Sequence, residues 1–413
     1  MTNEALINDR LTRLTPYSFV RLAELLERTA PAPGLEPVVM SVGEPQHAAP
    51  ALVDRVLRAT APLWNRYPPL AGTPDLRAAA TRWLERRYHL PAGMVDPETD
   101  VLPVSGTREA LFQAALLAVP AGRHGPVPAV CMPNPFYAAY EGAAAMAGAE
   151  PVYLDATADS AFLPDLEALS PELLNRTALF YLCSPANPQG AVADRFYLER
   201  LIGLARRHGF VLALDECYAE IYDRTPPPGG LEVASGIDGG ALDNLLVFHS
   251  LSKRSSAAGL RSGFVAGERR LIAGLRRLRG YSAAGMPLPV QAASAALWDD
   301  DAHVADNRAR YRAKFDLAQS VLGAALPLRR PAGGFFLWLD IDGAGLDGEA
   351  AALRLWRDAA VRVLPGAYLT RPSADGINRG DRFIRVALVH EPANLGPALE
   401  RMVGILTGPG DRR

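Results

Sequence analysis

A lysine, two serines and an arginine form the part of this chain best suited to covalent chemistry. Lys253 follows the apolar segment 244–248 and lies beside Ser250 and Ser252, and Arg261 comes eight residues later. A lysine amine can form a Schiff base with an aldehyde. An arginine can hold a phosphate dianion through two parallel hydrogen bonds. The segment therefore predicts a cofactor that carries both an aldehyde and a phosphate, and pyridoxal 5'-phosphate meets that description.

Two other interpretations of this segment are open. A single lysine in a serine-rich loop is usually a solvated surface residue. Residues 250–253, Ser-Leu-Ser-Lys, also match the S-x-x-K motif of serine acyl-transfer enzymes, with Ser250 as the nucleophile. That motif works with S-D-N and K-T-G partners, and neither follows Lys253 in the sequence. The rest of the chain has to decide between these interpretations.

Two further segments could hold the phosphate and the ring of such a cofactor. Gly106 and Thr107 separate a predicted strand from a predicted helix, where unpaired N–H groups and the helix dipole favour phosphate. Asp215 ends an apolar strand. A carboxylate buried there needs a cationic partner, which a protonated pyridine nitrogen would provide. Tyr218 could then hydrogen-bond to the phenolic oxygen of the ring. Taken singly, Thr107 and Asp215 are also typical of helix caps.

Two turns add an amide and an aromatic ring. Asn187 lies in a Pro- and Gly-rich turn after a strand, where its side chain could donate to the ring oxygen and to a substrate carboxylate. Tyr137 ends the turn 133–137 and could stack on the pyridine face. Each segment alone indicates no more than a turn or a core aromatic residue. Their order along the chain is more informative than any one of them.

Short apolar segments alternate with helical patterns, such as 108–118 and 196–208, through most of the chain. This alternation predicts an α/β fold with a mostly parallel sheet. The candidate residues follow strands, at the carboxyl edge of the sheet where ligands bind in such folds. The predicted strands are residues 100–104, 129–132, 151–154, 178–182, 210–214, 245–248 and 263–266.

The pattern changes to α+β after about residue 290. Strands are predicted at 333–339, 361–364 and 382–388, with a helix at 350–360 and a long connecting helix at 303–322. We therefore expect an N-terminal segment, residues 1–45, that joins the small domain, a large cofactor-binding domain, residues 46–290, and a small C-terminal domain, residues 291–413.

The composition narrows the choice of partners. A formal net charge of −2 predicts no strong attraction to nucleic acid or to anionic membranes. No apolar run approaches the ~20 residues of a membrane span. The three cysteines and seven histidines show neither a disulfide framework nor zinc-site spacing, so no metal is expected. Because the N-terminus shows no secretion signal, we expect a cytoplasmic protein that acts on small molecules.

One motif points elsewhere. Residues 343–348 match the dinucleotide-binding pattern G-x-G-x-x-G. That pattern requires an acidic residue at the end of the next strand, but the strand 361–364 is followed by Pro365 and Gly366. We therefore interpret residues 343–348 as a surface loop.

Taken together, these segments resemble the class I and II aminotransferases of fold type I over nearly the whole chain. The Ser-Gly-Thr loop, the Pro-x-Tyr turn, the Asn-Pro-x-Gly turn, the Asp-x-x-Tyr strand end and the Ser-x-Ser-Lys segment with its arginine occur in the order of that family. The resemblance implies a large domain with a mostly parallel seven-stranded sheet flanked by helices, plus a smaller α+β domain. It also implies a homodimer with shared active sites.

The resemblance assigns roles to individual residues. It implies that Lys253 forms the Schiff base and shuttles a proton, with Asp215 and Tyr218 as further catalytic residues. The other cofactor contacts that it implies are Gly106, Thr107, Tyr137, Asn187, Ser250, Ser252, Arg261 and, from the neighbouring subunit, Tyr67. For the substrate it implies Arg385 on a small-domain strand as the α-carboxylate ligand, together with Gly43, Asn187 and Tyr17.

Four longer stretches are similar to one subgroup, the N-succinyl-diaminopimelate aminotransferases of bacterial lysine biosynthesis. They are residues 66–74, 132–137, 249–255 and 259–267. This similarity implies ping-pong transfer of an amino group between N-succinyl-LL-2,6-diaminopimelate and 2-oxoglutarate, which yields glutamate.

Two arginines could bind the far ends of these substrates. Arg254 and Arg66 are candidates for the distal carboxylates of these substrates. The chain departs from the family pattern at residues 256–258, where Asn-x-Pro is expected. It also departs at Gln189, which replaces a threonine and is expected to have little effect on ring chemistry.

Several other functions stay open at this point. Another class I or II aminotransferase, of the aspartate, aromatic or alanine type, or a β-lyase would use the same cofactor residues. A serine acyl hydrolase would use Ser250. A non-catalytic regulator would need a DNA-binding domain, and the roughly 40 residues before the Ser41–Gly43 segment are too few for one with its linker.

Overall fold

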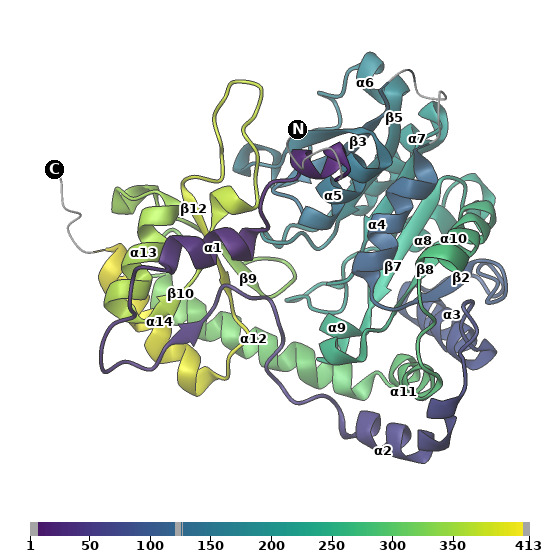
Figure 1. Ribbon diagram of the computed structural model, residues 1–413, viewed down its shortest axis with the longest axis horizontal. Helices are drawn as coiled ribbons and strands as arrows, with labels where there is room; N and C mark the ends of the chain where they lie inside the picture. The colour runs from purple at the N-terminus through teal and green to yellow at the C-terminus, as the bar shows by residue number, and fades with distance from the viewer. Residues whose placement is uncertain (1–6, 120–124, 126, 408–413) are drawn as a thin grey trace.

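The structure is a computed structural model that describes residues 7–119, 125 and 127–407. Figure 1 shows a larger part built on a central sheet and a smaller part at the other side of the molecule. The long helix α12 (Ala302–Leu322) runs between the two parts. None of the helices within the described ranges is long and apolar enough to cross a lipid bilayer.

The larger part contains a seven-stranded sheet in the order β2-β8-β7-β6-β5-β3-β4. All neighbouring strands are parallel except β8, which is antiparallel to both β2 and β7. The mostly parallel seven-stranded sheet predicted from the sequence is therefore confirmed. The strands are β2 (Val101–Val104), β3 (Ala129–Asn134), β4 (Glu150–Asp155), β5 (Thr177–Cys183), β6 (Val211–Asp215), β7 (Leu245–Ser250) and β8 (Gly263–Gly267).

Helices connect these strands and have recognisable end signals. The helix α3 begins after Thr73, whose side chain accepts a hydrogen bond from Leu76 N, and α7 begins after Asp194, which accepts from Tyr197 N. The helices of this part are α2 (Ala51–Ala59), α3 (Pro74–Tyr88), α4 (Thr107–Ala118), α5 (Ala138–Ala147), α6 (Pro171–Arg176), α7 (Arg195–His208), α8 (Gly230–Ser235), α9 (Leu251–Arg254), α10 (Arg269–Ser282) and α11 (Leu288–Asp299).

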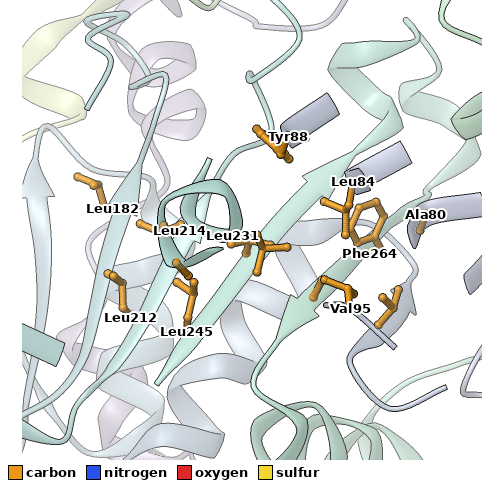
Figure 2. Close-up of a cluster of buried hydrophobic side chains, with 14 of the residues drawn as sticks. Ala80, Leu84, Tyr88, Val95, Leu182, Leu212, Leu214, Leu231, Leu245 and Phe264 are labelled. Atoms are coloured by element: carbon orange, nitrogen blue, oxygen red, sulfur yellow. The ribbon is translucent and has the colours of Figure 1, made fainter. Parts of the chain in front are cut away.

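Both faces of the sheet are buried. Successive residues of a strand point to opposite faces, and alternate residues of β6 belong to two different hydrophobic clusters. Leu212 and Leu214 of β6 belong to one hydrophobic cluster, whereas Val211 and Ala213 belong to the other. Figure 2 shows part of the first cluster, in which side chains of the sheet lie near Leu84 of α3. Burial of one large apolar side chain stabilises the fold by about 1.5–3 kcal/mol, so these two clusters fix the sheet between its helices.

The smaller part has a three-stranded antiparallel sheet in the order β11-β12-β9. Its N-terminal neighbours are α1 (Ser18–Leu26), which packs on α13, and β1 (Val38–Val39), which pairs in parallel with β10. The remaining elements are β9 (Phe336–Asp340), α13 (Gly348–Ala359), β10 (Val361–Arg362), β11 (Leu364–Pro365), β12 (Phe383–Ala387) and α14 (Pro392–Leu406).

Two predictions for this part can be compared with the structure. The single strand predicted at 361–364 is wrong in detail, because β10 and β11 pair with different partners, β1 and β12. Residues 343–348 form a turn and the start of α13, where Asp347 caps the helix by accepting from Ala350 N. The glycine-rich motif therefore forms the turn that leads into α13.

Candidate active site

A cavity of about 470 Å³ lies at the carboxyl edge of the large sheet and extends to the small part, where Phe336 and Arg385 line it. Most of the residues singled out in the sequence line this one cavity. They are Tyr17, Gly43, Thr107, Tyr137, Asn187, Asp215, Tyr218, Ser250, Ser252, Lys253, Arg261 and Arg385. Segments that are far apart in the chain thus supply one site.

Lys253 lies on the short helix α9, directly after β7. Its Nζ donates a hydrogen bond to the carbonyl of Gly43 at 2.5 Å, and the rings of Phe335 and Tyr218 lie 5.3 Å and 6.0 Å away. Burial lowers the pKa of Lys253 to about 8. A lowered pKa leaves more of the neutral amine, which is the form that attacks a carbonyl carbon.

A cradle for an anion lies beside this lysine. Gly106 precedes α4 with φ +93°, and a Cβ at this position would lie 2.3 Å from Nη2 of Arg261. Arg261 is itself held by a hydrogen bond from Nη1 to the carbonyl of Ala258 at 3.0 Å. Ser250 and Thr107 line the cavity next to them. The free N–H groups of α4, two hydroxyls and a guanidinium fit a phosphate group.

Asp215 ends β6 and is 6% exposed. Its carboxylate accepts hydrogen bonds from the hydroxyl of Tyr140 at 2.6 Å and from the backbone N–H of Cys217 at 3.3 Å. Burial raises the pKa of Asp215, and a cation beside the carboxylate would favour its ionised form. No helix starts at Asp215, since the next one, α8, begins at Gly230. The carboxylate therefore fits the protonated ring nitrogen of pyridoxal phosphate, and the helix-cap interpretation is wrong.

Tyr140 was not identified from the sequence. Its ring stacks on Tyr181 with centroids 4.3 Å apart, and the hydroxyl of Tyr181 donates to the carbonyl of Leu111 at 2.6 Å. Tyr140 comes three residues after Tyr137, so one turn of α5 carries both rings to the site. That helical spacing is the signal that could have revealed Tyr140.

Arg385 faces the cavity from β12 and is buried. Its Nη2 donates to the carbonyl of Ser41 at 2.6 Å, and its Nη1 donates to Oδ1 of Asn187 at 3.2 Å. Burial lowers the pKa of Arg385 to about 10. None of the ion pairs found among the described residues involves Arg385, so its charge is free to bind a substrate carboxylate.

A second arginine at the cavity was also missed. Arg108, in the first turn of α4, donates to the hydroxyl of Tyr17 at 3.0 Å and to the hydroxyl of Tyr137. Burial raises the pKa of Tyr137 to about 12, so its hydroxyl stays neutral. The position of Arg108 directly after the predicted Gly106–Thr107 loop was the available signal.

Gly106 borders the cavity next to Arg261 without lining it, and three other predicted contacts lie farther from the lining. Tyr67 and Arg66 are exposed, Tyr67 fully so. Arg254 is 2% exposed and donates to the carbonyl of Leu297 at 2.6 Å and to Asp301 at 2.8 Å. The hypothesis that Arg254 binds a distal carboxylate is therefore wrong. Arg254 follows Lys253 on a helix, so its side chain points about 100° away, toward the ring of Trp298.

The serine acyl-transfer interpretation requires a basic lysine beside a serine nucleophile. Instead, Ser250 Oγ accepts from Ser252 N at 3.1 Å and contacts the carbonyl of Ser262 at 3.5 Å. Lys253 Nζ is bonded to Gly43. The hydroxyl of Ser250 caps α9, which is a structural role.

Comparisons with known proteins agree with this geometry. Residues 36–402 match the family model described as aminotransferase class I and II. An LL-diaminopimelate aminotransferase of Desulforudis audaxviator is 31% identical over 406 residues, which are 96% of this chain and 97% of the relative. A 4-dedimethylamino-4-oxo-anhydrotetracycline transaminase of Streptomyces rimosus is 33% identical over 370 residues, 88% of this chain and 92% of the relative.

Solved structures show the same fold. An aminotransferase from Neisseria meningitidis Z2491 has a TM-score of 0.90 and 40% identity, covering 97% of this chain and all of the other. A single mutant of Thermus thermophilus aspartate aminotransferase has a TM-score of 0.83 and 26% identity, covering 97% and 99%. The fold type I architecture and the pyridoxal phosphate cofactor expected from the sequence are confirmed. The chain belongs to the class I and II aminotransferase family.

Proposed function

We propose that the protein transfers an amino group between N-succinyl-LL-2,6-diaminopimelate and the 2-oxoglutarate–glutamate pair. The observation that carries the choice of a substrate with a second carboxylate is Arg108. Its guanidinium lines the cavity and is bonded to two tyrosine hydroxyls, and it forms no ion pair among the described residues. With Arg385 bound to the α-carboxylate, Arg108 offers a second cation for a second carboxylate. Each of the proposed substrates carries at least one carboxylate besides the α-carboxylate, two in the succinylated donor and one in 2-oxoglutarate and glutamate.

The residues of the chain divide the work as follows. When bound, the cofactor supplies an electron sink for negative charge that develops at the substrate α-carbon. Lys253 would hold the cofactor through its amine, and the same amine would act as general base for the proton of that α-carbon and then as general acid. Arg385 and Asn187 orient the α-carboxylate. Asp215 keeps the ring nitrogen protonated, and Tyr140 holds the carboxylate of Asp215 in place.

We extend the proposal to the assembly of the protein and to its domains. Tyr67 does not line the cavity of its own chain and is fully exposed, which supports a homodimer in which Tyr67 reaches the cofactor of the other subunit. Residues 46–290 would then hold the cofactor. The segments 1–45 and 291–413 would bring Gly43 and Arg385 to the substrate.

A second candidate substrate is LL-diaminopimelate without the succinyl group. Several relatives of 29–31% identity carry the name LL-diaminopimelate aminotransferase. This substrate has the same α-amino acid end and the same seven-carbon chain, so the anchors described above serve it equally.

A half-reaction screen of the purified holoenzyme tests these proposals. Each amino donor is added alone, and the loss of the bound aldehyde form of the cofactor is followed by absorbance. A strong response to N-succinyl-LL-diaminopimelate and glutamate, with none to alanine or aromatic amino acids, is expected. A stronger response to LL-diaminopimelate favours the second candidate. A preference for aromatic donors, or release of pyruvate from cystathionine, contradicts both.

A further inference from the structure

Gln189 is a polar residue in the cavity wall to which the reaction described above assigns no role. It occupies the position of the expected threonine in the turn Asn187–Gly190. The side chain lines the cavity and is 4% exposed. Among the described residues, no group donates a hydrogen bond to its Oε1. A buried acceptor without a donor is costly, so a ligand that supplies the donor would be bound in preference to one that does not.

The turn that carries Gln189 is held by its backbone. Gly190 N donates to the carbonyl of Ala186 at 2.7 Å, and Ala332 N donates to the carbonyl of Gly190 at 3.1 Å. The carbonyl of Gln189 accepts from Nη1 of Arg329 at 3.3 Å. These contacts fix the backbone of Gln189. The torsion angle that rotates its terminal amide is the least restrained part of the residue, because such torsions have broad energy wells. The amide can therefore turn toward a ligand without movement of the turn.

The surroundings of Gln189 place it between the substrate anchor and an apolar wall. Two residues before it, Asn187 accepts from Arg385. Arg329, which binds the carbonyl of Gln189, also covers the ring of Phe162 at 4.7 Å. Phe162 and the two residues after it, Leu163 and Pro164, line the cavity without a polar side-chain group. A polar group beside an apolar wall is the arrangement by which ligand pockets fix the orientation of a ligand.

We infer that Gln189 is a specificity-determining residue whose amide oxygen accepts a hydrogen bond from an N–H group on the side chain of the amino donor. The inference rests on the proposed function, because diaminopimelate-type donors carry a second nitrogen at C6. That nitrogen is an amide N–H in the succinylated form and an ammonium in the free form, and Gln189 can accept from either. Glutamate has no such group. Gln189 would therefore distinguish diaminopimelate-type donors from glutamate, whereas Arg385 and Arg108 would bind carboxylates of both kinds of donor.

The test compares a donor that carries the second nitrogen with a donor that lacks it. LL-diaminopimelate or its N-succinyl form is compared with 2-aminopimelate, which has the same seven carbons and both carboxylates but no second nitrogen. For each donor kcat/KM is measured in the half-reaction. In the wild-type holoenzyme the donor with nitrogen is expected to be preferred. In Gln189→Met, which has similar length and no comparable acceptor, that preference should fall about 5- to 150-fold.

A second variant distinguishes loss of the hydrogen-bond acceptor from loss of folding. Gln189→Glu keeps an acceptor oxygen at the same place, so it should retain the preference for the donor with nitrogen. Cofactor absorbance and the melting temperature of each variant report on folding independently of activity. An unchanged ratio in Gln189→Met, with wild-type protein active on diaminopimelate donors, would overturn the role of Gln189 and leave the proposed function intact. No reaction of the wild-type protein with either diaminopimelate donor, while glutamate reacts, would overturn both.

Discussion

Lys253 and Lys314 are the two lysines of the chain, and their surroundings differ in a way that decides their chemistry. Lys253 lines the active-site cavity. Lys314 is 1% exposed, and its Nζ donates to the carbonyl of Val389 at 2.8 Å and lies 3.3 Å from Nε2 of His47. Burial lowers the pKa of both lysines to about 8, so the pKa alone does not identify the reactive amine. The reactive amine is identified by its access to the cavity.

Borohydride reduction of the holoenzyme is therefore a sharp test at the scale of the residue. Reduction should fix one pyridoxyl group per chain on Lys253, and peptide mass mapping should find none on Lys314. Lys253→Ala should lose the tag completely because, among the residues that the structure describes, no second amine lines the cavity. A tag on Lys314, or a tag that persists in Lys253→Ala, would contradict the assignment of the reactive lysine.

The pKa of Lys253 predicts how cofactor binding depends on pH. Below pH 8 the ammonium form dominates, and it cannot attack the aldehyde. The rate of covalent reconstitution of the apoenzyme should fall roughly tenfold per pH unit below 8 and level off above it. The measurement is the rise of cofactor absorbance after mixing. A rate that keeps rising up to pH 10 would show that burial does not lower this pKa.

Arg108 can be tested by substrate discrimination. Arg108→Met removes the second cation but keeps a long side chain, so kcat/KM for 2-oxoglutarate should fall by about 10- to 150-fold, the usual value of a hydrogen bond to a charged group. The value for pyruvate, which has one carboxylate, should change much less. Equal losses for the two acceptors would instead indicate damage to the cofactor site, because Arg108 also contacts Tyr137.

At the scale of the element, the reversal of the chain between β7 and β8 matters most. The segment 251–262 contains α9 with Lys253, and it returns the chain antiparallel to β7. Gly267 ends β8 with φ +150°, and a Cβ there would lie 2.0 Å from the carbonyl oxygen of Leu245. This close approach keeps the two strands paired and so holds α9 at the edge of the sheet.

Gly267→Ala should therefore destabilise the protein by about 1–3 kcal/mol, as expected for forced backbone strain. Urea denaturation followed by circular dichroism would measure this change. Gly404→Ala is the matched control, because Gly404 lies within α14 with open space around its Cα. An alanine there should stabilise the helix by roughly 0.5–1 kcal/mol. Equal effects of the two substitutions would contradict the close approach at Gly267.

At the scale of the whole molecule, the exposed aromatic residues indicate where a second subunit would bind. Trp64, Tyr67 and Tyr281 are 55%, 102% and 89% exposed. A Cβ at Gly285 would lie 2.7 Å from Pro68, so the segments that carry these rings lie side by side. Exposed apolar surface of this kind commonly marks a protein–protein interface.

Subunit complementation tests the proposed exchange of Tyr67. Lys253→Ala and Tyr67→Ala proteins are each expected to be nearly inactive. A hybrid dimer would contain one complete site, formed by Lys253 of one chain and Tyr67 of the other, so mixing the two variants after dissociation should restore activity. If Tyr67 acted within its own chain, no hybrid site would be complete, and activity would stay at the level of the parents.

The sequence by itself determined the elements and the residues that follow them. All seven predicted strands occur in the large sheet, because alternation of apolar and helical patterns is a local property of the chain. Asp215, Asn187 and Lys253 were placed together for the same reason: each follows a strand, and parallel strands end at one edge. The family likeness extended this to Arg385 on β12. Their roles in catalysis stay predictions, as do the domain limits.

Only the tertiary structure decided which side chains turn toward the cavity. Arg254 and Lys253 are adjacent in the sequence, yet α9 directs Arg254 into the core and Lys253 to the cavity. Arg108, Tyr140 and Gln189 enter the site through packing between segments far apart in the chain, which local patterns do not encode. Periodicity fixes where a residue lies along an element, but the rotation of that element against its neighbours fixes what the residue touches.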